Sequence, residues 1–266
     1  MWVRMIGGGE EAVELSRMLQ LAFGLFVDVM GVQQDFLLTD EHDEALTRFN
    51  SCRERLKGFH TDLESTIAQE LWRSDGGSKG AVGPVFVAEF SDSAYVVSEH
   101  FASVASIGAS LMRKALRHEY PLRGGIGVGT FAHETSGARV LQNGQIWSTS
   151  SFLGGAIVSA YHAEQNGAPG MRVFIHPQVM ATSADERLTE YAIPLGETES
   201  NDKANSELRF WSAVEAPLAL ERLYKFRDKQ RIPDRAAKHY DASAVAYKRF
   251  ASAEGHLPDI VPAFWL

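Results

Sequence analysis

Two aspartates stand where strand-like stretches would otherwise be apolar, and their position suggests metal chemistry. Asp28 follows the apolar segment 23–27, and Asp92 lies between the apolar segments 85–87 and 95–97. Burying an unpaired carboxylate is costly, so such a group is normally paired or bound to a metal ion. We predict a metal site built on both carboxylates. The alternative is that each aspartate caps a turn at the end of a strand.

The elements around these aspartates alternate in a recognisable order. Apolar periodicity and turn residues predict strands over 21–30, 84–90, 94–99 and 122–131, and helices over 43–72 and 99–118. The order βαββαβ indicates an α+β, ferredoxin-like fold, with Asp92 in the turn of its hairpin. Further along, we expect a third helix over 149–165, with Ser150 or Ser151 as its N-cap, and strands over 171–175, 189–194 and 207–214.

Changes in character along the chain predict three parts. Residues 1–16 form a glycine-broken leader, 17–214 form the main domain, and 215–266 form a helical C-terminal extension in which basic residues become frequent. The last residues, 260–266, are apolar, and we expect them to dock on this protomer or on another.

Composition excludes several classes of protein. The 266 residues are 45% hydrophobic and 23% charged, which is typical of a soluble globular protein. The net charge of −8 and the lack of a basic block give no sign of nucleic-acid binding. No apolar run reaches the roughly 20 residues that span a bilayer, and the N-terminus lacks a signal-peptide pattern. The single cysteine, Cys52, suits a reducing compartment, so we expect a cytoplasmic protein without membrane association.

Several motifs together resemble the catalytic domain of class III nucleotide cyclases, over about residues 20 to 215. The first-strand motif Phe-x-Asp-Ile-x-Gly-Phe is matched with Val29 in place of Ile and Val32 in place of the last Phe. The other matching segments are the hairpin 90–93, the glycine-rich strand 123–129, the helix start 154–160 and the strand 169–175 that follows Pro-Gly. By this resemblance, 17–214 is the cyclase domain and its fold is the ferredoxin-like palm of that family.

The resemblance implies a two-metal site. Asp28 and Asp92 would hold two divalent ions, Mn²⁺ or Mg²⁺, with the backbone carbonyl of Val29 as a further ligand. Both ions prefer oxygen ligands, and neither Cys52 nor the scattered histidines form a zinc pattern.

The resemblance also implies the substrate contacts. The backbone amides of Met30, Gly31 and Val32 would lie along the triphosphate of a nucleoside triphosphate. Lys203 falls about where the family places a phosphate-binding lysine, the alternative being a solvated loop lysine.

Four positions depart from the purine-cyclase pattern. Ala88 and Ser151 replace the base-reading Lys and Asp, and Val158 and His162 replace the transition-state Asn and Arg. The chain therefore resembles most the bacterial pyrimidine cyclases of anti-phage (Pycsar) systems, which implies conversion of UTP to cyclic UMP and pyrophosphate. Ser151 and its neighbours would face the base. The alternatives are a cytidylate or purine cyclase, or a degenerate nucleotide-binding or dimerisation module.

The resemblance implies two kinds of partner. Cyclases of this class complete their sites from two domains, so we expect a homodimer. A separate effector protein would be reached only through the cyclic nucleotide. A diguanylate-cyclase-like domain shares the palm but carries Gly-Gly-Asp/Glu-Glu-Phe at the hairpin, which residues 90–93 do not match.

Overall fold

The computed structural model describes residues 2–5, 17–32, 42–75, 85–140, 146–183, 188–212, 214–229 and 234–252. Its strands are β1 (Trp2–Met5), β2 (Arg17–Val29), β3 (Phe86–Glu89), β4 (Ser93–Ser98), β5 (Leu122–Val140), β6 (Ile146–Leu153), β7 (Val173–Ile175), β8 (Ala192–Pro194) and β9 (Ser206–Leu208). Its helices are α2 (His42–Asp75), α3 (Phe101–Arg117), α4 (Gly155–Asn166), α5 (Pro177–Thr182), α6 (Leu188–Tyr191), α7 (Ala216–Lys229) and α8 (Asp234–Ser252).

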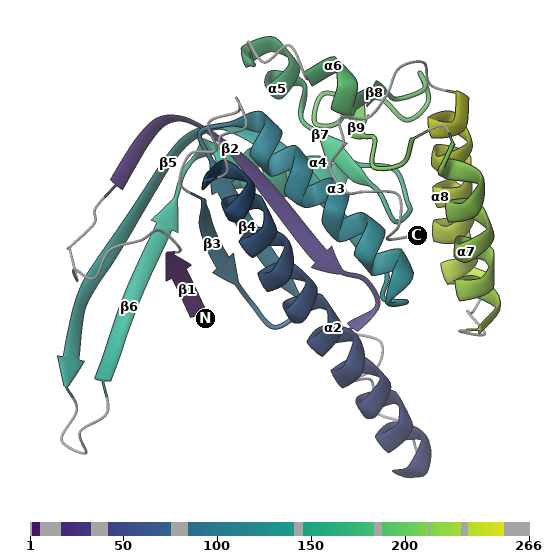
Figure 1. Ribbon diagram of the computed structural model, residues 1–266, viewed down its shortest axis with the longest axis horizontal. Coiled ribbons are helices and arrows are strands. Elements are labelled where there is room, and N and C mark those ends of the chain that lie inside the picture. The colour runs from purple at the N-terminus through teal and green to yellow at the C-terminus, as the bar shows by residue number, and fades with distance from the viewer. Residues whose placement is uncertain are drawn as a thin grey trace.

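The centre of the molecule is a βαββαβ unit made of β2, α2, β3, β4, α3 and β5 (Figure 1). In the sheet these strands follow the order β3-β4-β2-β5, and each neighbouring pair is antiparallel. This is the ferredoxin-like arrangement, so the predicted α+β palm is confirmed. Additional strands extend the sheet on both sides, with β1 beside β3 and with β7, β9 and β8 beyond β5.

Alternate residues of β2 face opposite sides of the sheet, as a strand requires. Leu25 and Val27 belong to the main apolar core together with residues of α2 and α3. Gly24 faces the other way, toward the backbone of Ala156 in α4. Two helices therefore cover one face of the palm, and α4 covers part of the other face, where Asp28 lies.

The glycine-rich stretch of β5 exists because α4 lies directly on it. A Cβ atom added at Gly125 or Gly127 would collide with the backbone of Ala160, and one at Gly129 would collide with Gly155. The Gly-x-Gly-x-Gly pattern therefore permits close helix–sheet packing.

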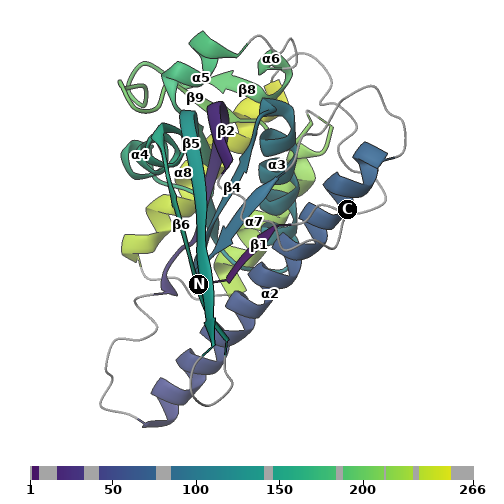
Figure 2. The same ribbon diagram turned by 90° about the vertical axis from the view of Figure 1, so that its left-hand side faces the viewer.

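Where the structure departs from the sequence-based elements, pairing across the sheet explains the difference. The predicted third helix over 149–165 begins only at Gly155, so the N-cap assignment of Ser150 and Ser151 was wrong. Both serines belong to β6, opposite residues of β5 in a long antiparallel hairpin (Figure 2). Gly154, with φ of 146°, separates that strand from the helix.

The later strands are shorter than the sequence suggested. The stretch predicted as a strand over 189–194 begins as α6 and becomes β8 at Ala192, and the strand predicted over 207–214 is the three-residue β9. In the leader, Trp2–Met5 pairs with β3 as an edge strand. The apolar end 260–266 lies outside the described residues.

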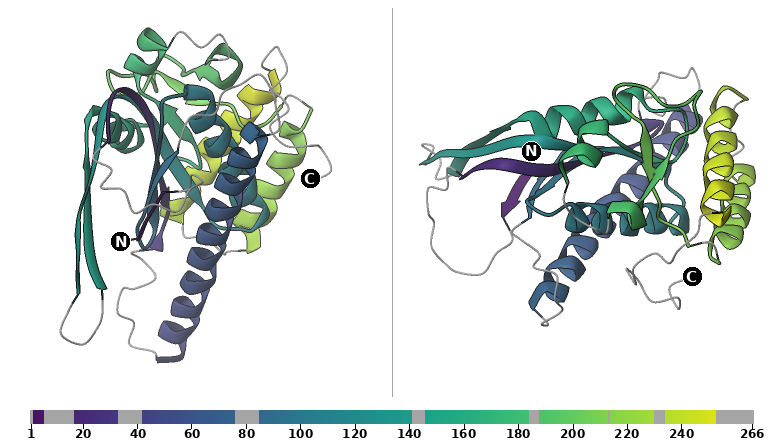
Figure 3. Two further views of the ribbon diagram at one scale, coloured as in Figure 1. Left: turned by 60° about the vertical axis from the view of Figure 1, so that its left-hand side comes forward. Right: turned by 90° about the horizontal axis from the view of Figure 1, so that it is seen from above.

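The helices α7 and α8 lie side by side at one edge of the molecule (Figure 3). Their buried side chains, among them Leu223, Phe226, Tyr247 and Phe250, join the same apolar core as β2 and α3. No helix in the described part of the chain is long and apolar enough to cross a membrane.

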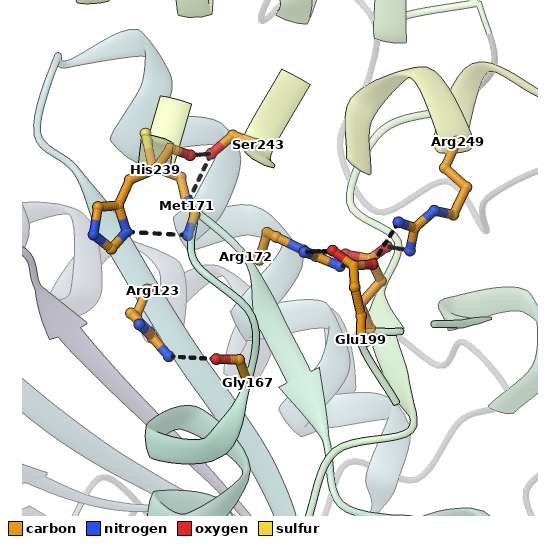
Figure 4. A network of polar contacts seen from close by, with 10 residues as sticks. Arg123, Gly167, Met171, Arg172, Glu199, His239, Ser243 and Arg249 are labelled. Atoms are coloured by element: carbon orange, nitrogen blue, oxygen red, sulfur yellow. Dashed lines mark hydrogen bonds and ion pairs between the residues drawn. The ribbon is translucent and has the colours of Figure 1, made fainter. Parts of the chain in front are cut away.

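A buried polar network fastens α8 to the sheet (Figure 4). The fully buried guanidinium of Arg172 donates to Glu207 at 2.7 Å and to Glu199 at 2.8 Å. Arg249 of α8 donates to the same two carboxylates, at 2.6 and 2.7 Å. The two arginines lower the pKa of Glu199, whereas burial raises the pKa of Glu207 despite them.

Candidate active site

The fold brings Asp28 and Asp92 together at one end of two adjacent strands. In the β2–β4 pair, Asp28 lies opposite Ser93, the residue after Asp92. The amide of Val29 donates to the carbonyl of Asp92 at 2.8 Å, which ties the two aspartate-bearing segments through the backbone. The hydroxyl of Ser91 donates to Oδ1 of Asp92 at 3.0 Å. The pairing that the sequence suggested is therefore a feature of the fold.

The carboxyl group of Asp28 has an unusual affinity for protons. Burial, the negative charge of Asp92 and the charge of Glu164 raise its pKa from 3.8 to about 7, against the opposing charge of Arg123. Two carboxylates that share a site disfavour simultaneous ionisation, and a cation placed between them would reverse this. Burial is the largest cause of the raised pKa of Asp28, and the charge of Asp92 adds to it.

The donor set fits a hard divalent ion. Among the described residues, no group of three or more His, Cys, Asp or Glu side chains is placed to hold a metal ion. Asp28 and Asp92 contribute two carboxylates at this end of the sheet. Mg²⁺ is typically held by one or two carboxylates, with waters and substrate phosphates as its other ligands. Asp28 and Asp92 therefore fit Mg²⁺ or Mn²⁺, and the carbonyl of Val29 stays a predicted ligand.

The loop after Asp28 corrects one sequence-based assignment. The amide of Met30 donates to the carbonyl of Pro121 at 2.9 Å, so it is engaged within the protein and does not point at a phosphate. Gly31 is exposed with φ of 82°, a left-handed conformation that favours glycine, and Val32 is buried. The predicted phosphate-binding amides are therefore reduced to those of Gly31 and Val32.

Sequence reasoning missed an ion pair beside Asp28. Arg123 lies opposite Asp28 in the β2–β5 register, and its Nε lies 2.6 Å from Oε1 of Glu164 on α4. Both side chains are largely buried. The sequence alone could not show this pair, because Glu164 comes beneath the sheet only through the close packing of α4 on the glycines of β5.

Lys203 lies in the loop between β8 and β9. Its Nζ lies 3.1 Å from Asp202, its side chain is partly exposed, and its amide donates to the side chain of Asn201. Burial lowers the pKa of His176, and the charges of Lys203 and His162 lower it further, so these three side chains lie near one another.

The base-reading positions differ in their surroundings. Ala88 is fully buried in a cluster with the rings of Phe86, Phe90, Tyr95 and Phe152. Ser151 is exposed on β6, and its neighbour Phe152 points into that cluster instead. The ring centroids of Tyr95 and Phe152 are 5.9 Å apart. Aromatic side chains therefore fill the space beside Ala88.

Comparison with known proteins gives structural neighbours only. No family model and no curated protein sequence matches the chain. It is similar to the guanylyl cyclase Cya2, with a TM-score of 0.44, 10% identity and coverage of 73% of this chain and 93% of that one. It is similar to the guanylate cyclase domain of RhGC from Catenaria anguillulae (TM-score 0.41, 13% identity, 72% and 96% coverage). It is also similar to adenylate cyclases from Trypanosoma brucei (TM-score 0.45, 12% identity, 72% and 88% coverage).

Proposed function

We propose that this protein is a nucleotide cyclase. The carrying observation is the Asp28–Asp92 pair, held at the ends of adjacent strands of a ferredoxin-like palm and tied through the backbone of Val29. Asp28 is partly buried, and burial together with the charge of Asp92 raises its pKa to about 7, so a cation bound beside it would favour its charged form. The pattern matches the first-strand and hairpin motifs of class III nucleotide cyclases.

The reaction is attack of the ribose 3′-hydroxyl on the α-phosphate, with release of pyrophosphate. Phosphoryl transfer of this kind depends on in-line positioning and on neutralising charge at the phosphate oxygens, which bound divalent ions supply. In this chain, Asp28 and Asp92 would hold the ions. The amides of Gly31 and Val32 orient the triphosphate. Arg123, opposite Asp28 in the β2–β5 pair, is a cation whose charge lowers the pKa of Asp28.

A second copy of the chain would complete the site. By the resemblance to class III cyclases, whose sites are completed from two domains, Lys203 and His162 would contact the nucleotide that is held by the aspartates of a partner protomer. We therefore propose a homodimer with two equivalent sites.

The base is proposed to be a pyrimidine, with UTP as substrate and cyclic UMP as product. Ala88 offers no polar group to the edge of a purine base. The aromatic side chains around Ala88 reduce the room for a base beside it. An unmet polar edge in a closed site costs roughly 1–3 kcal/mol, which disfavours a purine. Ser151 is the exposed hydroxyl proposed to face the base. The role in anti-phage signalling through a separate effector stays a prediction from the resemblance.

Substitution of either aspartate tests the assignment. Asp28→Ala or Asp92→Ala should lower cyclic-nucleotide formation at saturating Mn²⁺ by at least about a thousandfold, because electrostatic stabilisation dominates such reactions. Asp241→Ala, an exposed carboxylate of α8, is the matched control and should keep full activity. Wild-type turnover in either active-site variant would rule the site out.

A further inference from the structure

Helix α2 contacts the turn that carries Asp92 directly, and it contacts the start of β5, which in turn holds the loop after Asp28. Nε2 of His60 lies 3.1 Å from the carbonyl oxygen of Ser91, in the turn between β3 and β4. A carbonyl can only accept, so the imidazole donates this bond. Nδ1 of His60 lies 3.5 Å from Glu89 on the same hairpin. One side chain of α2 therefore holds the turn in which Asp92 lies.

Two residues further along, Asp62 anchors the second segment. Its carboxylate is 4% exposed and accepts hydrogen bonds from the hydroxyl of Tyr120 at 2.9 Å and from Nδ1 of His118 at 2.7 Å. Tyr120 is fully buried and precedes Pro121, whose carbonyl accepts the amide of Met30. Asp62 thus fixes the start of β5, which in turn holds the loop that follows Asp28.

We infer that His60 and Asp62 are positioning residues of the metal site. The β2–β4 ladder joins the two aspartate-bearing segments, and beyond it the amide of Val29 donates to the carbonyl of Asp92. The contacts from α2 hold the turn at Asp92 directly and the loop after Asp28 through Tyr120 and Pro121. Groups that orient metal ligands typically change metal affinity by 10–100-fold when removed. The inference rests on the proposed function, because it assigns these residues to the same carboxylate pair.

The test is Mn²⁺ binding measured without turnover, by the loss of the free-Mn²⁺ electron paramagnetic resonance signal on titration into nucleotide-free protein. His60→Ala should weaken binding about tenfold. His60→Gln keeps an N–H at the position of Nε2 and should restore binding to near the wild-type value. Lys57→Ala, an exposed residue one turn earlier on α2, is the control and should bind normally.

Tyr120→Phe is the second test variant, because it removes only the hydroxyl that donates a hydrogen bond to Asp62. It should weaken Mn²⁺ binding severalfold while circular dichroism shows an intact fold. Binding equal to wild type in both His60→Ala and Tyr120→Phe would overturn the positioning role alone. Two results would contradict the proposed function, and the inference with it. One is that wild-type protein binds no Mn²⁺, and the other is that Asp28→Asn binds Mn²⁺ as well as wild type does.

Discussion

Asp28 is a carboxylate that the folded, metal-free protein holds in an unfavourable environment. The pKa of Asp28 is about 7 in the folded protein, whereas an aspartate in water has a pKa of 3.8. Between these two values the native state binds one more proton than the unfolded state. The contribution of Asp28 to stability is therefore favourable at low pH and is lost as the pH rises toward 7.

Replacement of Asp28 by asparagine should consequently stabilise the metal-free protein at pH 8. We expect a gain of roughly 2 kcal/mol in the free energy of unfolding, about half of the full linkage value because Asp28 is partly solvated. The gain should shrink as the pH falls toward about 5. Urea unfolding in the presence of a chelator at both pH values measures it, and a destabilised Asp28→Asn protein at pH 8 would contradict the assigned electrostatics.

At the scale of elements, the network around Arg172 shows how the C-terminal helices are joined to the palm. Arg172→Met leaves Glu207, 1% exposed, with only Arg249 as a partner. Loss of one partner from a buried ion pair costs about 3–5 kcal/mol. The control is Arg227→Ala, which breaks the exposed pair with Asp241 between α7 and α8 and should cost at most about 1 kcal/mol. Equal denaturation midpoints for the two variants would show that the network contributes nothing.

The palm could be predicted from the sequence because the patterns that indicate its strands and helices are local in the chain. Apolar periodicity marked α2 and α3, and the interruptions at Asp28 and Asp92 marked the strand ends. The start of α4 could not be predicted in this way. Ser150 and Ser151 are good N-cap residues. They belong to β6 instead, because β5 is long enough to pair with them. The engagement of the Met30 amide by Pro121 is likewise a contact between segments far apart in the chain.

At the scale of the whole molecule, the proposed homodimer would place Lys203 of one chain at the nucleotide that is held by the aspartates of the other. Mixing equal amounts of Asp28→Ala and Lys203→Ala proteins, each nearly inactive alone, should restore about a quarter of wild-type activity. This follows because half of the dimers are mixed and each mixed dimer has one intact site. Additive residual activity after subunit exchange, with no restoration, would show that each site is built within a single chain.

The most direct measurement of the central claim is product analysis after incubating the purified protein with Mn²⁺ and each of the four common ribonucleoside triphosphates. The account predicts cyclic UMP and pyrophosphate in equal amounts from UTP, slower conversion of the other three, and no product with Asp28→Ala. Faster conversion of ATP or GTP would contradict the base assignment. The absence of a cyclic product from every nucleotide, under conditions where the protein is a folded dimer, would contradict the cyclase itself.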